Sequence, residues 1–73
     1  MTLEEKKEEI VSEIIKLRHE QGLTQKQLEK LSGVKQPIIA RMETGTTIPQ
    51  LSTILKILFS LGKTITIVPI ENK

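Results

Sequence analysis

Apolar residues recur at helical spacing in the first third of the chain. Thr2 and Glu5 have the spacing of a capping box, in which each side chain binds the other residue's backbone amide. Further along, apolar side chains follow one another at steps of four and three, which places them on one helix face. The pattern therefore predicts a helix over residues 3–21, ended by Gly22. Its inward stripe consists of Ile10, Ile14 and Leu17.

The middle of the chain predicts two short helices joined by a tight turn. Thr24 and Gln27 form a second capping box, and Gly33 supplies the positive φ that ends a helix. Pro37 lies at the start of a further helix, where its missing N–H costs nothing, and Gly45 ends that helix. This arrangement is typical of a helix-turn-helix. The inward face of its second helix consists of Ile39 and Met42.

The last third of the chain predicts one more helix and a strand. Residues 50–61 have helical spacing, and we expect the core face to contain Leu51, Ile54, Leu58 and Leu61. Leu55 and Phe59, one turn apart, lie toward a different side. Residues 64–70 alternate polar and apolar and are rich in β-branched side chains, which predicts a strand. Because no second strand is predicted, we expect this strand to pair with that of a second copy.

Length and composition limit the class of protein. The 73 residues form one domain, residues 1–73, whose small core favours oligomerisation. The sequence has no cysteine, so disulfides and thiolate metal sites are excluded and a reducing cytoplasm is favoured. The N-terminus is charged, unlike a signal peptide, and no apolar run approaches the roughly 18 residues that suggest a membrane span. We therefore expect a cytoplasmic protein without a membrane partner.

The distribution of charge is more informative than the net charge of +2. Acidic residues concentrate in the first twenty positions. Residues 22–45 carry four basic side chains and two acidic ones, namely Lys26, Lys30, Lys35 and Arg41 against Glu29 and Glu43. This asymmetry predicts that DNA binds at the middle of the chain.

These motifs resemble the DNA-binding domain of the Cro/repressor family, also called the XRE family. The matching elements are Leu23-Thr24-Gln25, Leu28, Ser32-Gly33-Val34, Gln36-Pro37, Ile39, Arg41, Glu43, Gly45, Ile48-Pro49, Leu51, Ile54 and Leu61-Gly62. The resemblance covers about residues 14–62. It implies an all-α, four-helix, lambda-repressor-like DNA-binding core over that range, to which the strand at about 64–70 is added for dimerisation.

The resemblance places the second motif helix in the major groove of DNA, with its first residues at the base edges. The predicted base-contacting residues are Gln36, Pro37, Ala40 and Arg41. Gln36 has the donor and acceptor that match adenine, Arg41 has donors that match guanine, and Pro37 offers apolar contact to a thymine methyl. The alternatives are a solvated Gln36 and an Arg41 that binds phosphate. Ile38 either touches a thymine methyl or packs locally.

Phosphate contacts are expected on both sides of that helix. Thr24 and Gln25 begin a helix, where free backbone N–H groups and the dipole favour a phosphate. Lys35 precedes the reading helix, and Thr46 and Thr47 follow it. Lys35 stands where the family commonly has a Ser or Thr cap, so the predicted cap is in doubt while a cation is gained.

The resemblance also pairs Arg18 with Glu43, an ion pair that would fix the angle between their helices; the alternative is two exposed charges. Catalysis has little support. His19 is the only histidine, and no cysteine or convergent pair of carboxylates accompanies it. We therefore predict a protein that is not an enzyme and that binds no cofactor and no metal.

Three functions fit these features. The first is a homodimeric transcriptional repressor that binds a pseudo-palindromic operator. The second is the antitoxin of a toxin–antitoxin pair, similar to HigA or HipB antitoxins, which also binds a toxin protein and represses its own operon. The third is an interaction module that does not bind DNA, and the Gln36-Pro37-Arg41 surface counts against it. The residues expected at the dimer interface are Leu55, Phe59, Thr64, Ile65, Thr66, Ile67 and Val68.

Overall fold

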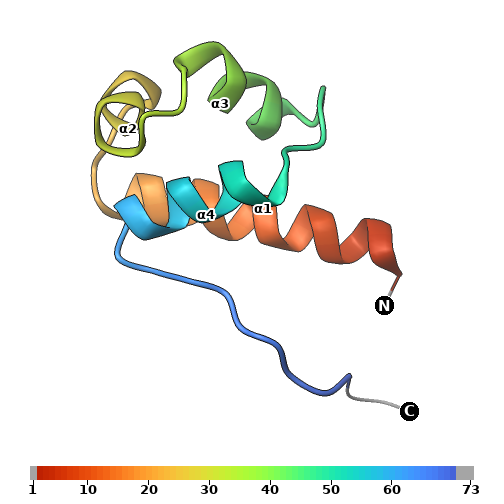
Figure 1. Cartoon of the computed structure of the whole chain (residues 1–73). Coiled ribbons are helices and arrows are strands. Elements are labelled where there is room, and N and C mark those ends of the chain that lie inside the picture. Colours follow the sequence, from red (N-terminus) through yellow and green to blue (C-terminus); the bar gives the residue numbers. More distant parts are fainter. Residues whose placement is uncertain (1, 71–73) are drawn as a thin grey trace.

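Four helices make up most of the chain in this computed structural model, which describes residues 2–70. They are α1 (Leu3–Glu20), α2 (Gln25–Ser32), α3 (Gln36–Thr44) and α4 (Leu51–Ser60), and the predicted all-α class is confirmed. Figure 1 shows α2 and α3 above α1 and α4. Residues 1 and 71–73, counted above within the single domain, lie outside the described range. Within that range, no helix has the length and hydropathy needed to cross a membrane.

Both predicted capping boxes are present. The Thr2 hydroxyl accepts the Glu5 N–H at 3.1 Å, and the Glu5 carboxylate accepts the Thr2 N–H at 2.8 Å. Thr24 and Gln27 make the same exchange at 3.0 and 2.8 Å. Gly33 ends α2 at a φ of 81°, where a residue with a Cβ would be strained. These local signals begin α1 and α2 and set the turn between the two motif helices.

A single apolar core joins all four helices. Its buried residues are Ile14, Leu28, Val34, Ile39, Met42, Ile54, Ile57, Leu58 and Leu61. Both helices of the motif contribute to it, so burial of this shared surface holds α2 and α3 against α1 and α4. The partly buried Ile10, Val11, Leu17 and Leu23 pack around it.

One part of the predicted core face is wrong. Leu51 is 62% exposed, although its spacing from Ile54 and Leu58 predicts burial. Helical spacing fixes which side of a helix faces the core, but it does not say how far along the helix other elements cover that side. Leu51 is the first residue of α4, and its apolar side chain continues in line with Leu55 and Phe59. We call these three side chains, Leu51, Leu55 and Phe59, the α4 ridge.

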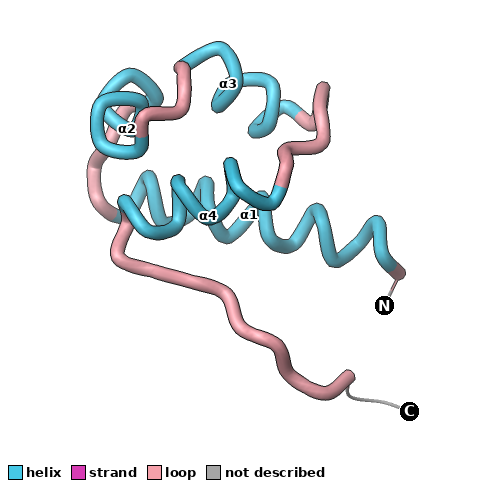
Figure 2. The backbone as a smooth tube through the Cα atoms, viewed as in Figure 1, coloured by secondary structure: helices cyan, strands magenta, loops and turns pink. Residues whose placement is uncertain are grey.

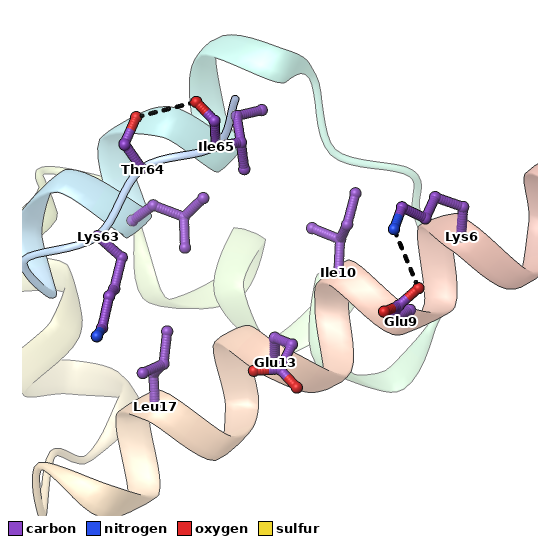
Figure 3. Close-up of a pocket in the computed structure, with 9 residues that line it drawn as sticks. Lys6, Glu9, Ile10, Glu13, Leu17, Lys63, Thr64 and Ile65 are labelled. Atoms are coloured by element: carbon purple, nitrogen blue, oxygen red, sulfur yellow. Dashed lines mark hydrogen bonds and ion pairs between the residues drawn. The ribbon is translucent and has the colours of Figure 1, made fainter. Parts of the chain in front are cut away.

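The segment after α4 is extended and forms no strand within the described residues (Figure 2). A strand requires backbone partners from another strand, and the rest of the described chain is helical or in loops. Ile65 lines a shallow pocket with residues of α1 and α4 (Figure 3). Ile67 and Val68 are 98% and 68% exposed, and Thr64 and Thr66 are exposed as well.

Candidate nucleic-acid interface

α3 carries the predicted base-contacting residues outside its fully buried face. Ile39 and Met42 are 0% and 1% exposed. Because successive residues are rotated by about 100° around a helix, Pro37, Ala40 and Arg41 point away from Ile39 and Met42. Gln36 lies at the edge of the buried face, where its side chain contacts Gln25 of α2. Pro37 and Arg41 are exposed, and Gln36 and Ala40 are half-buried. Ile38, beside them, is 40% exposed.

The first turn of α3 is capped from the neighbouring helix. Lys35 is the N-cap residue and makes no side-chain cap. The Glu29 carboxylate of α2 instead accepts the Gln36 N–H at 3.2 Å. The same oxygen accepts a hydrogen bond from the Lys26 ammonium at 3.3 Å. This bond, together with the one from Gln36, lowers the pKa of Glu29, although desolvation acts in the opposite direction. The cap that the sequence left in doubt is thus supplied by Glu29, and Lys35 is exposed.

A line of hydrogen bonds joins Gln36 to the other end of α3. The Gln36 Nε2 donates to Gln25 Oε1 at 2.7 Å. Gln25 Nε2 in turn donates to Glu43 Oε1 at 2.9 Å. The Gln25 side chain is therefore engaged between two residues of α3, and a phosphate contact by Gln25 is left to its backbone N–H.

Arg18 and Glu43 form a shielded ion pair. Arg18 Nε donates to Glu43 Oε2 at 2.8 Å and Nη2 donates to Oε1 at 2.9 Å, while the side chains are only 11% and 9% exposed. Arg18 Nη1 also donates to the Leu23 carbonyl at 2.8 Å. Nη2 contacts the ring of His19 at 3.0 Å, where the ring nitrogen accepts because a guanidinium has no acceptor. The pair thereby ties α1 to the end of α3 and to the turn before α2.

The remaining phosphate candidates lie at exposed positions. Thr24 accepts the Gln27 N–H at the start of α2, and its own hydroxyl proton remains able to donate. Thr46 and Thr47 follow Gly45, the left-handed end of α3, and both of their N–H groups point to the Arg41 carbonyl, at 2.9 and 3.4 Å. Lys35 and this threonine pair therefore flank α3 at its two ends.

Sequence reasoning missed the contacts of two polar side chains of this site, Glu29 and Gln25. A lysine at an N-cap position lacks the acceptor that the cap needs, and this could have prompted a search for an acceptor such as Glu29 on the preceding helix. No comparable signal marks Gln25, because its two bonds depend on the angle at which α2 and α3 pack.

A capped helix, a glycine turn and a second helix with Gln36 and Arg41 outside its core define a helix-turn-helix DNA-binding domain. The chain belongs to the helix-turn-helix family, whose model matches residues 14–68. This match confirms the resemblance to the Cro/repressor (XRE) type. The family points to a DNA-binding regulator rather than an enzyme.

Two known proteins are similar over most of the chain. An uncharacterized HTH-type transcriptional regulator of Haemophilus influenzae is 58% identical over 64 residues, which cover 88% of this chain. The chain spans 65% of the length of that relative. A solved chain of a toxin–antitoxin module from Streptococcus pneumoniae is 54% identical and superposes with a TM-score of 0.78, covering 97% of this chain and 84% of that one.

Proposed function

We propose that the protein is a sequence-specific transcriptional repressor, acting in the cytoplasm, that inserts α3 into the major groove of its operator. The observation that carries this proposal is the surface of α3 outside its core. Pro37, Ala40 and Arg41 point away from the buried Ile39 and Met42, and the half-buried Gln36 lies beside them at the start of the helix. Gln36 matches adenine and Arg41 matches guanine, while Pro37 and Ile38 offer apolar contact to a thymine methyl.

Phosphate contacts around α3 would hold it in the groove. Thr24 and the backbone amide of Gln25 lie at the N-terminus of α2, where the helix dipole favours an anion. Lys35 lies immediately before α3, and Thr46 and Thr47 lie just after it. Contacts of this kind set register and contribute affinity that falls with salt, but they carry no sequence information.

The proposed operator-binding form is a homodimer. The α4 ridge and the tail leave large apolar side chains uncovered in one copy: Leu51 and Phe59 are each 62% exposed and Ile67 is 98% exposed. Antiparallel pairing of residues 64–68 about a two-fold axis would give each tail a backbone partner. The two α3 helices must then lie about 34–36 Å apart to enter successive major-groove faces. Such a dimer reads a pseudo-palindrome.

An antitoxin role is the second candidate, and one observation favours it. The similar solved chain belongs to a toxin–antitoxin module. In this version the protein binds the same operator and also a toxin protein, and it represses the operon that encodes both. A toxin-sized reading frame beside the coding region, whose product co-purifies with this protein, would support this role. Purification of the protein alone from cells that express both frames would count against it.

Selection of random DNA duplexes, repeated at several salt concentrations, tests the proposed DNA binding. We expect one enriched pseudo-palindromic motif and an affinity that falls steeply with salt. If the protein retained duplexes of all sequences equally, sequence-specific binding would be contradicted.

A further inference from the structure

The hydrogen bonds that link Arg18, Gln25 and Gln36 all converge on the Glu43 carboxylate, which only accepts them. We propose that this fixed order of donors and acceptors determines which base Gln36 prefers. In this proposal Glu43 is a positioning residue that touches no base. It acts through Gln25 to fix the orientation of the Gln36 amide, so that Gln36 reads adenine and rejects guanine. The inference rests on the proposed DNA binding and adds to it the origin of specificity at one base pair.

The Glu43 carboxylate of the ion pair fixes the order of donors and acceptors. Arg18 donates to both oxygens of the Glu43 carboxylate, at 2.8 and 2.9 Å. A carboxylate only accepts hydrogen bonds, so the group of Gln25 that meets Glu43 must be its NH₂. The observed contact is Gln25 Nε2 to Glu43 Oε1, at 2.9 Å. Because the Glu43 side chain is only 9% exposed, water has little room to replace this partner.

The orientation of the Gln25 amide then fixes that of Gln36. With its nitrogen turned toward Glu43, Gln25 presents only Oε1 to Gln36, and an oxygen must receive a donor. Gln36 meets it with Nε2 at 2.7 Å. One N–H and the oxygen of Gln36 remain for DNA. Adenine offers the N7 acceptor and the N6 donor in the major groove, which is the complementary pair.

The opposite orientation would select a different base. If the oxygen of Gln36 faced Gln25, its two N–H groups would remain for DNA. Two donors match guanine, which presents the N7 and O6 acceptors. Rotation of one side-chain amide by half a turn therefore distinguishes adenine from guanine, and in this chain Glu43 is the group that sets that rotation.

Gln25→Lys is the sharpest test because an ammonium only donates. It would still donate to Glu43, but it would also donate to Gln36 and turn the Gln36 oxygen inward. We expect the preference at the base pair read by Gln36 to change from adenine to guanine. The measurement is the affinity for four operator duplexes that differ only at this base pair. A matched bidentate contact discriminates by roughly 10- to 100-fold, so the change is measurable.

Glu43→Gln and Glu43→Asp form the second arm. Glu43→Gln replaces one acceptor by a donor, so we expect the adenine preference to fall about tenfold while preferences at other positions stay unchanged. Glu43→Asp keeps the carboxylate and should retain the preference. Ile57→Val, a destabilising core change in α4 that leaves all four polar residues in place, controls for lost stability and should also retain it.

Unchanged adenine preference in folded Gln25→Lys and Glu43→Gln would overturn the inference while leaving the proposed DNA binding intact. A wild-type protein that selects no operator would instead refute the DNA binding. In that case the orientation is read in the free protein from the side-chain amide NMR signals of Gln25 and Gln36. Protection of one Nε2 proton on each residue, lost in Glu43→Gln, supports the fixed order of donors and acceptors, and equal exchange of all these protons overturns it.

Discussion

Glu29 of α2 accepts the backbone N–H of Gln36, the first residue of α3, at 3.2 Å. The cap of the proposed reading helix therefore comes from the other helix of the motif. A Ser or Thr cap depends only on local backbone geometry, whereas this one also depends on how α2 and α3 pack. The contact makes the start of α3 sensitive to the charge of Glu29.

The first prediction concerns acid stability. The pKa of Glu29 lies below its ordinary value of 4.5 in the folded chain, first because of the Lys26 ammonium and then because of the Gln36 N–H. A group with a lowered folded pKa contributes stability above its unfolded pKa and loses it as pH falls through the folded pKa. Melting temperatures of wild type and Glu29→Gln should therefore converge below pH 4.5. A constant difference from pH 7 to pH 3 would contradict this mechanism. At pH 7, Glu29→Ala should melt below Glu29→Gln because it also loses the acceptor.

The second prediction concerns the shielded ion pair. Arg18→Met should destabilise the fold by about 3–5 kcal/mol, because it leaves the Glu43 charge without its partner in a largely water-free position. Replacing both residues, as in Arg18→Met with Glu43→Leu, should recover much of that loss. Thermal melting of the two single variants and the double variant measures the coupling. A single-variant loss of less than about 1 kcal/mol, the value of an exposed pair, would show that the pair is not shielded in solution.

The third prediction separates phosphate contact from base contact. Lys35→Ala should weaken binding to all DNA sequences alike and lower the slope of log affinity against log salt by about one. Lys56→Ala, which removes an exposed lysine from α4, is the matched control and should leave the slope unchanged. Titrations at four salt concentrations give the slopes. Equal slopes for wild type and Lys35→Ala would remove Lys35 from the interface.

The fourth prediction concerns assembly. Removal of the residues after Gly62 should give a monomer that keeps its helical content, since the core cluster ends at Leu61, but loses most of its operator affinity. Sedimentation and circular dichroism measure both properties. Phe59→Ser in the full-length chain tests the α4 ridge separately and should weaken the dimer without removing the tail. A truncated chain that remains dimeric would show that the helices alone hold the copies together, and the tail would then need another partner.

Short-range signals predicted the helices correctly. Thr24 and Gln27 lie three residues apart, so their capping box needs only the local backbone. Gly33 ends α2 for an equally local reason, its positive φ. Helical spacing also predicted the inward faces of α1 and α3, where Ile14, Ile39 and Met42 are buried.

Features that depend on how elements meet could not be predicted in the same way. Leu51 has the spacing of a core residue and is exposed, because helical spacing does not say which positions of a face other elements cover. Gln25 was placed correctly at the start of α2, but its side chain turns inward between Gln36 and Glu43. A strand in the tail requires a second chain, so one copy does not test it.

Base preference in the Gln36→Ala and Arg41→Ala variants tests the central claim most directly. The two variants and the wild type are each used to select duplexes from the same random pool. We expect the wild type to yield two half-sites whose centres lie about one helical turn apart. Each variant should lose roughly 1–3 kcal/mol of affinity and relax the preference at one base pair per half-site, leaving the others intact. An unchanged motif in both variants, with wild-type affinity, would show that the surface of α3 outside its core does not read DNA.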